Sequence, residues 1–345
     1  MARKEDDKRK VQKKLSPLRA TCSVVALVVG LSQAPFWNWF FGAAGSAGCP
    51  WWVCGQSNSP VIDGAATATS KPLGVATRSF HELNLHGLPN AAGFAVAGIR
   101  MGDTPYEIEV QGAAVSAQPL GRRGSRLTGA MLVGLVIDLR DANGARYALR
   151  VAGAGTTAHW VAPLSPIPTY LLTYTTNAEG EKPLCAAANH EAILFAGDRY
   201  DGVRKTVTAT GAAAEGWVNV ACAGTALAKL FLVRHTQASQ LVPTTSGERQ
   251  ALLKMLTADV CGDGHSFTVP GQPLYWADAK GITRFPDAPR RLEAVWNEDG
   301  AVCMDQPRRP ELAAAIDERC GPLPRCSSSS HGYVISANPR SSRKE

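Results

Sequence analysis

The segment 258–266, Ala-Asp-Val-Cys-Gly-Asp-Gly-His-Ser, holds the densest set of reactive side-chain types in the chain. Asp263 and His265 could act as an acid/base pair, with Ser266 or Cys261 as the nucleophile. Catalysis requires these atoms to lie within hydrogen-bond reach, which adjacency in a glycine-rich turn does not ensure. The same residues are typical of a tight turn fixed by a disulfide, in which Asp263 accepts hydrogen bonds from its own backbone. We prefer the turn and keep the catalytic use as the alternative.

A second pair of carboxylates, Asp198 and Asp201, lies three residues apart within 196–202. Two carboxylates at this spacing could bind a cation or exchange protons with a substrate. The surrounding glycines instead favour a turn between strands, in which Asp198 and Arg199 face solvent.

The spacing of the histidines and cysteines does not match that of known metal or cofactor sites. The sequence contains neither Cys-x-x-Cys nor His-Glu-x-x-His, and His81, His86 and His190 have no third ligand at a suitable spacing. It also lacks the Gly-x-Ser-x-Gly turn that carries the nucleophile of many hydrolases. We therefore expect no metal and no cofactor.

Nine cysteines remain the most informative chemical feature. Cys22 lies in the leader, and the other eight could form four disulfides in an oxidising compartment. The short Gly/Pro-containing loop between Cys320 and Cys326 predicts one bridge, and order along the chain suggests two more. The two pairs suggested by order are Cys185–Cys222 and Cys261–Cys303, and Cys54 is a further candidate with no assigned partner. Lipidation of Cys49 would leave an odd number of cysteines for bridges.

The N-terminus has the order of an export segment. Eight Lys and Arg residues precede the apolar stretch Val24–Leu31, and no charge occurs between Arg19 and Asp63. The apolar stretch is short for a membrane-spanning helix, which needs about 20 residues. Cleavage by a signal peptidase, lipidation at Cys49 and an uncleaved anchor are three open outcomes.

The charge balance excludes one large class of partners. Residues 1–48 contribute +5 of the formal net charge of +7, so the rest of the chain is nearly neutral. No basic stripe interleaved with aromatic residues remains, which argues against nucleic-acid binding. Contact with a membrane is expected only through the N-terminal segment.

Hydrophobic patterning predicts a mainly β, β-rich α+β fold of antiparallel strands with a few short helices. Residues 106–110 alternate strictly, and the run 131–139, which is apolar except for Asp138, predicts a strand buried on both faces. Asn143-Gly144 predicts a hairpin turn in which both residues take positive φ. Further strands are expected at 92–99, 146–151, 169–173, 192–195 and 217–222.

Two helices are predicted, each with one apolar stripe. The first, 248–259, follows Ser246 as its cap, and the second, 310–319, begins with a proline and aims Cys320 at the core. The expected organisation is a leader at 1–48, a linker and Cys segment at 49–79, a β-rich domain at 80–326, and a disordered tail at 327–345. Within the domain, 80–180 and 181–326 could form two subdomains.

The segment 257–268 resembles the signature of the ADYC domain, which is named for its Ala-Asp-Tyr-Cys motif. Val260 stands here in place of the tyrosine. The segments 217–229 and 302–308 agree with the same family, as do 54–60 and 80–90, so the resemblance covers roughly 50–326. It implies an exported bacterial protein with structural cysteines. The family has no known activity, and therefore no catalytic residues to transfer.

Two functional hypotheses follow. The first is a non-enzymatic domain, secreted or in the cell envelope, that binds an envelope component or another surface protein. The second is an exported hydrolase that uses the region of Asp263 and His265, with Asp198 or Asp201 assisting. A free thiol at Cys261 would favour the enzyme, whereas a bridge there would favour the binding module.

Overall fold

The computed structural model describes residues 56–57 and 80–339, except for 122–123, 162–165, 177–179, 186–190 and 288–289. All of these residues belong to the unit Trp37–Glu345. The predictions for the leader, the linker, Cys49, Cys54 and the last six residues lie outside the described residues. No described helix combines the length and the apolar character needed to cross a membrane.

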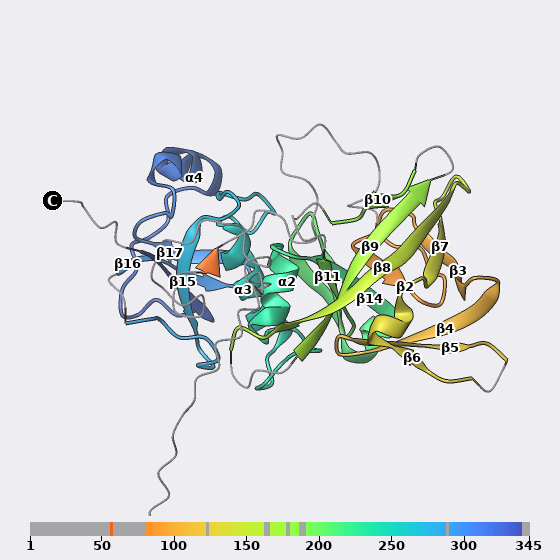
Figure 1. Cartoon of the computed structure of the whole chain (residues 1–345). Coiled ribbons are helices and arrows are strands. Elements are labelled where there is room, and N and C mark those ends of the chain that lie inside the picture. The colour runs from red at the N-terminus through yellow and green to blue at the C-terminus, as the bar shows by residue number, and fades with distance from the viewer. Residues whose placement is uncertain are drawn as a thin grey trace, which may run out of the picture. The chain divides into compact units, whose positions relative to one another are not determined.

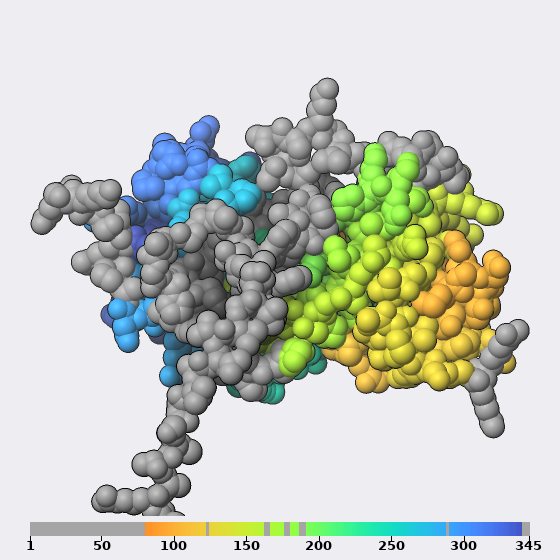
Figure 2. Space-filling view, viewed as in Figure 1, coloured from red at the N-terminus to blue at the C-terminus, as the bar shows by residue number. Residues whose placement is uncertain are grey.

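The larger of two main sheets has eleven antiparallel strands (Figure 1). The long central strands β8 and β9 are coloured yellow to light green on the face viewed in Figure 2. Buried and exposed side chains alternate in the middle of β8, over residues 149–152. In spatial order the strands are β2 (Glu82–Asn84), β14 (Trp217–Cys222), β11 (Glu191–Phe195), β9 (Pro166–Thr176), β8 (Arg146–Ala158), β7 (Val136–Arg140), β3 (Ala95–Met101), β4 (Thr104–Gln111), β5 (Ala114–Pro119) and β6 (Leu127–Thr128), with β10 (Lys182–Pro183) beside β9.

The second sheet packs against helices. Its antiparallel strands are, in order, β1 (Gln56–Ser57), β15 (Pro273–Asp278), β18 (Val334–Pro339), β16 (Arg290–Asn297) and β17 (Gly300–Met304). Helix α3 (Ser246–Thr257) contacts β16, β17 and β18, and α2 (Ala226–Leu232) contacts α3. The remaining elements are the pair β12 (Asp198–Asp201) and β13 (Thr206–Thr210), the helix α4 (Ala313–Cys320), and the short 3-10 helices η2 (Gly129–Leu132), η3 (Gly211–Ala214) and η4 (Pro310–Leu312).

The buried apolar side chains form two clusters, and the larger sheet contributes to both, with Ile167, Ile193 and Phe195 packed in the cluster of the helices. Phe80, Leu132 and Tyr170 belong to the cluster of the larger sheet, whereas Leu252 and Trp296 belong to that of α2, α3 and the smaller sheet. The predicted mainly β fold with a few short helices is confirmed.

The apolar run 131–139 is not one strand, contrary to the prediction. Helix η2 ends at Leu132, and β7 begins only at Val136. Gly134 between them has a φ of +97°, a conformation that a strand does not contain. Leu132 and Leu135 are buried, but Met131 and Val133 are exposed, so the predicted burial on both faces is wrong as well.

The predicted hairpin at Asn143-Gly144 is present, because β7 pairs with β8 from Arg140↔Arg146 onward. Its loop is longer than two residues, and only Gly144 takes a positive φ, of +82°. The carboxylate of Asp141 accepts hydrogen bonds from the N–H groups of Asn143 and Ala145 at 2.9 Å each. This capping stabilises the turn without a left-handed Asn143.

Helix α3 confirms the first predicted helix, but its N-cap differs from the predicted one. Thr245, not Ser246, is the N-cap, and it exchanges hydrogen bonds with Glu248 in a capping box. The second predicted helix is present as η4 followed by α4. Helix α2 was not predicted, because every residue of Ala226–Leu232 is buried and the segment has no polar face to reveal a helical period.

The predicted disordered tail at 327–345 starts too early. Residues 334–339 form β18, which lies between β15 and β16 in the smaller sheet. Val334, Ser336 and Ala337 are buried in it. Ser336 accepts a hydrogen bond from Trp296 and donates one to Glu293, which fixes the middle of β18 against the neighbouring strand β16.

Candidate functional site

The segment 258–266 forms a turn that leaves the end of α3. Ala258 takes the left-handed conformation with a φ of +48°, which is uncommon for a residue other than glycine. Its carbonyl accepts a hydrogen bond from the N–H of Phe267 at 3.0 Å, and the carbonyl of Val260 accepts one from the N–H of Ala301 in β17 at 3.0 Å. The motif therefore joins α3 to the smaller sheet, and we call residues 258–266 the ADYC turn.

Asp259, the acidic residue of the motif, is fully buried and pairs with a fully buried lysine. Its Oδ2 atom lies 2.6 Å from Nζ of Lys254, which also donates to the carbonyls of Arg204 and Gly262. All three hydrogens of the ammonium group are thus used. The carboxylate also accepts the N–H of Gly264 at 3.0 Å. Asp259 therefore acts as a structural counter-ion.

Cys261 is bridged to Cys320, so it offers no thiol for nucleophilic attack. Helix α4 ends at Cys320 and places its sulfur against Cys261 of the ADYC turn. A bridge partner was one of the two environments predicted for this residue, the other being the core. Cys326 instead bridges Cys303, and its N–H donates a hydrogen bond to the side chain of Asp305, just beyond β17. The predicted pairs Cys320–Cys326 and Cys261–Cys303 are therefore wrong.

The third bridge joins Cys185 and Cys222, with 5.4 Å between their Cα atoms, and confirms the pair suggested by chain order. Three disulfides are consistent with an extracellular or periplasmic location.

Asp263 and His265 are both exposed, and their side chains make different contacts. Asp263 accepts hydrogen bonds from the backbone N–H of His265 at 2.9 Å and from Arg319 at 2.7 Å. Partial burial opposes ionisation, but these two donors outweigh it and lower the pKa of Asp263. The imidazole of His265 packs edge-on against Phe267, with 4.6 Å between ring centroids. The backbone contact is the one that the turn interpretation predicts.

Ser266 accepts a hydrogen bond from Nζ of Lys205, a residue that no local pattern connects with it. Lys205 is nearly fully buried. Burial, only partly offset by Asp259, lowers the pKa of Lys205 to about 8. The pair brings a hydroxyl and a readily deprotonated amine together at the end of the ADYC turn.

Asp198 does not face solvent, which corrects the prediction. Its carboxylate is fully buried and accepts hydrogen bonds from Arg249 at 2.9 Å, from the N–H of Gln237 at 2.7 Å and from Tyr200 at 3.1 Å. The local sequence could not reveal this burial, because Arg249 lies in α3, far along the chain from Asp198. Asp201 does cap a turn, through the N–H groups of Val203 and Arg204.

Arg199, which was also predicted to face solvent, packs instead against other parts of the protein. Its guanidinium lies 3.4 Å from the centre of the Trp217 ring and pairs with Glu82 at 2.7 Å. The carboxylates of Asp198 and Asp201 therefore have separate partners and do not form one site. His81 is buried, His86 is exposed and His190 lies outside the described residues. The described residues contain no group of His, Cys, Asp or Glu that could hold a metal ion.

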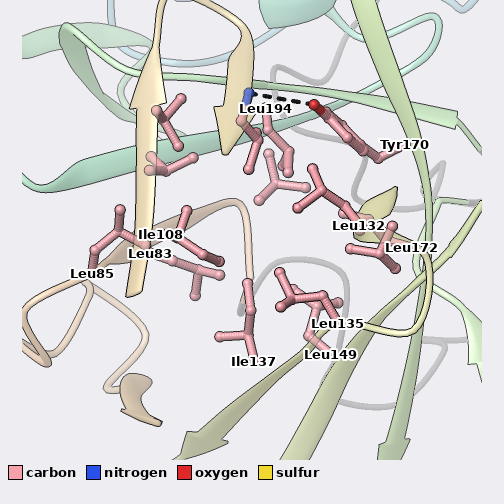
Figure 3. A pocket seen from close by; sticks show the side chains of 15 residues that line it. Leu83, Leu85, Ile108, Leu132, Leu135, Ile137, Leu149, Tyr170, Leu172 and Leu194 are labelled. Carbon is pink, nitrogen blue, oxygen red and sulfur yellow. Dashed lines mark hydrogen bonds between the residues drawn. The ribbon is translucent and has the colours of Figure 1, made fainter. Parts of the chain in front are cut away.

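An enclosed cavity lies inside the larger sheet and is lined only by apolar residues and Tyr170 (Figure 3). The hydroxyl of Tyr170 accepts a hydrogen bond from the N–H of Val115 at 3.4 Å, drawn as a dashed line. The cavity has a volume of about 30 Å³, whereas small-molecule sites occupy about 300–1,000 Å³. An apolar space of this size stays dry, so it is a gap in the core.

A groove of suitable size runs along β4, and we call it the β4 groove. One part, of about 340 Å³, lies between β4 and the beginning of β14. The adjoining part, of about 600 Å³, lies between β4 and β3. Both parts are lined by Leu85, His86, Glu107 and Ile108.

The groove exists because β3 and β4 separate soon after their turn. They pair only at Arg100↔Pro105 and Met101↔Thr104, whereas β4 pairs with β5 over all of Tyr106–Gln111. Strand β2 pairs with β14 alone. Within the described part of the chain, no strand pairs with the second edge of residues 106–111.

Unpaired carboxylates surround an apolar floor in this groove. Leu85, Ile108 and Val110 form part of the floor. The lining cations Arg100 and Arg126 are paired, with Asp138 and Glu109 respectively. Three lining carboxylates have no ion-pair partner among the described residues, namely Asp103, Glu107 and Glu215.

The groove was not predicted from the sequence, because its walls come from segments more than 100 residues apart. The one local signal was the alternation in 106–110, which places glutamates on one face of a strand and apolar side chains on the other. Alternation predicts a half-buried strand, but it cannot tell which edge of that strand is paired.

The contacts described so far define a disulfide-linked, β-rich domain whose signature residues fix a turn. The ADYC domain family matches residues 129–310, more than half of the chain. The chain belongs to the ADYC domain family, which confirms the resemblance. No significant match to a curated protein or to a solved structure was found.

Proposed function

We propose that this chain is an exported, non-enzymatic binding module of the cell envelope or the secreted fraction, and that it binds its partner in the β4 groove. The observation that carries the proposal is the groove itself. It combines a volume typical of ligand sites, an apolar floor and an unpaired strand edge. Its partner is an envelope component or another surface protein.

Export is supported by the basic leader, the apolar stretch after it and the three disulfides. Cleavage of the leader would release the domain, whereas lipidation at Cys49 or an uncleaved leader would hold it at a membrane. All three outcomes place the domain outside the cytosol.

A non-enzymatic role is supported by the contacts of the ADYC turn. Asp259 is neutralised by Lys254, Cys261 is oxidised, and Asp263 is held by Arg319 and its own backbone. Each of these side chains has a structural partner, so the residues best suited to chemistry stabilise the turn.

The proposal is tested in living cells with a photo-crosslinking amino acid at position 120 or position 203. Leu120 lines the groove, whereas Val203 lies outside it; both are well exposed. We expect a crosslinked adduct from position 120 and none from position 203, on protein whose thiols are oxidised. Reduced protein in the cytosolic fraction, or equal crosslinking from both positions, would refute the proposal.

A second function, an exported hydrolase, is favoured by the contact between Lys205 and Ser266. A neutral lysine could accept the hydroxyl proton as Ser266 attacks a carbonyl carbon, with Asp263 and His265 nearby in sequence. The lowered pKa of Lys205, about 8, makes the neutral amine accessible in mildly alkaline solution. This alternative predicts that a fluorophosphonate probe labels the wild type but not Ser266→Ala. Absence of labelling in the wild type would exclude it.

A further inference from the structure

We infer that the β4 groove receives an extended polypeptide segment, which adds to the sheet as a strand along β4 and alternates aliphatic with basic side chains. The inference rests on the proposed function and names the class of partner. Three features of the groove lead to it, namely its backbone edge, the two faces of β4 and the unpaired charges.

The backbone of β4 offers hydrogen-bonding groups to an incoming strand. In an antiparallel pair, every second residue directs its N–H and C=O groups away from its partner. The pairing with β5 therefore leaves such groups along Tyr106–Gln111 pointing toward the groove. No described strand uses them, and an unpaired edge of this kind is a template for strand addition.

The side chains of β4 specify what the added strand must carry. Ile108 is buried and Tyr106 and Val110 are half-buried on one face, whereas Glu107 and Glu109 are exposed on the other. A strand laid beside β4 continues these two faces, because side chains of neighbouring strands stand next to each other. Its inward residues meet apolar side chains, and its outward residues meet carboxylates.

The charges of the groove select basic residues for the outward positions. Arg100 and Arg126 are already paired, while Asp103, Glu107 and Glu215 are not paired with any described residue. The excess is three negative charges, which attracts Lys or Arg side chains and repels acidic segments. Residues 105–110 of β4 line the groove, so at about 3.3 Å per residue the occupant spans about 20 Å, or six residues.

The test measures binding of dye-labelled peptides to the purified protein, disulfides intact, by fluorescence anisotropy. The probe is acetyl-Lys-Val-Lys-Val-Lys-Val-amide. One control, acetyl-Lys-Lys-Lys-Val-Val-Val-amide, has the same composition without the alternation. A second control carries N-methyl groups on the backbone of alternate residues, in two versions of opposite phase. Methylation removes the donors needed on one edge of a strand but preserves every side chain.

We expect the alternating peptide to bind at least about tenfold more tightly than the block peptide. The N-methylated version whose modified edge faces β4 should lose at least about fivefold, because each lost backbone hydrogen bond is worth about 1 kcal/mol. These peptide comparisons require no change in the protein, so they do not depend on a variant folding correctly.

The matched protein variants are Glu107→Lys in the groove and Glu318→Lys on α4. Both sites are exposed and undergo the same charge change. Glu107→Lys should weaken binding of the alternating peptide by about 5- to 30-fold, since an attraction becomes a repulsion. Glu318→Lys should change it less than about twofold.

The failures are distinguishable. If the block and N-methylated peptides bind as tightly as the probe, the groove attracts charge without adding a strand, and the inference is wrong while the proposed function stands. If no peptide binds at millimolar concentration but position 120 still forms an adduct in cells, the partner has another chemistry. If neither peptide binding nor an adduct is found, the inference and the proposed function both fail.

Discussion

Replacing Lys254 by methionine tests whether the aspartate of the ADYC motif is a structural counter-ion. Methionine fills a similar volume with a flexible apolar chain and removes the ammonium group. Asp259 would stay fully buried, with the N–H of Gly264 as its principal remaining donor. The carbonyls of Arg204 and Gly262 would also lose their donor.

The expected loss in the free energy of unfolding is about 3–5 kcal/mol, because the buried carboxylate loses its ion-pair partner and keeps only the more distant attraction of Lys205. The double variant Lys254→Met/Asp259→Leu should recover much of this loss, since both charges leave the interior together. The matched control is Arg319→Met, which breaks the exposed pair with Asp263 in the same turn. Exposed pairs are worth at most about 1 kcal/mol, so the control should stay within that limit.

The assay is urea unfolding at pH 7 with the disulfides intact, followed by tryptophan fluorescence. A shift in the midpoint at constant slope reports a change in stability alone. The reasoning is refuted if Lys254→Met costs less than about 1 kcal/mol, or no more than Arg319→Met. It is equally refuted if the double variant is less stable than the single one.

Three further predictions concern other features of the fold. A non-reducing peptide map should contain Cys261 joined to Cys320 and Cys303 joined to Cys326, and a Cys320–Cys326 peptide would contradict the structure. The double variant Cys261→Ala/Cys320→Ala should lose about 4 kcal/mol of the free energy of unfolding, because the bridge spans 59 residues. Burial, with the nearby Arg234, lowers the pKa of His159 to about 4. The unfolded chain therefore binds more protons than the folded chain between about pH 6.5 and 4, and stability should fall as the pH is lowered through that range. The variant His159→Phe should lose this pH dependence, and an unchanged pH profile of stability would contradict the assignment. Gly262→Ala should destabilise by more than about 2 kcal/mol, because a Cβ there would lie 1.8 Å from the carbonyl oxygen of Asp299 at a φ of +74°; Gly211→Ala, with a φ of +57° and open space around it, is the control, and equal thermal shifts would contradict the argument.

Local sequence was a good guide to the conformation of segments whose two sides differ in polarity. The alternation at 106–110 and the stripe Leu252, Met255, Leu256 correspond to β4 and α3. It was a less reliable guide where both sides are buried, because the run 217–222 was correctly predicted as a strand, β14, whereas α2 was missed. Every residue of helix α2 is buried, including its one charged residue, Lys229, so the sequence shows no polar face and no helical period.

Asp198 and Asp259 show the corresponding limit for the candidate sites. Both are acidic residues next to turns, and such residues are usually exposed. Each is fully buried because a cation reaches it, Arg249 for Asp198 and Lys254 for Asp259. Arg249 is 51 residues away from its partner, so no spacing rule could have paired them.

Residue types and their order were sufficient to predict an export-like leader, and to identify a β-rich body, cysteines suited to bridges and membership of the ADYC domain family. These properties depend on composition and on contacts between near neighbours. The bridge partners of Cys261 and Cys303, the counter-ion of Asp198 and the open edge of β4 were settled only by folding. Each of them depends on which distant segments come together, and the free energy of packing the whole domain, rather than any local preference, determines that choice.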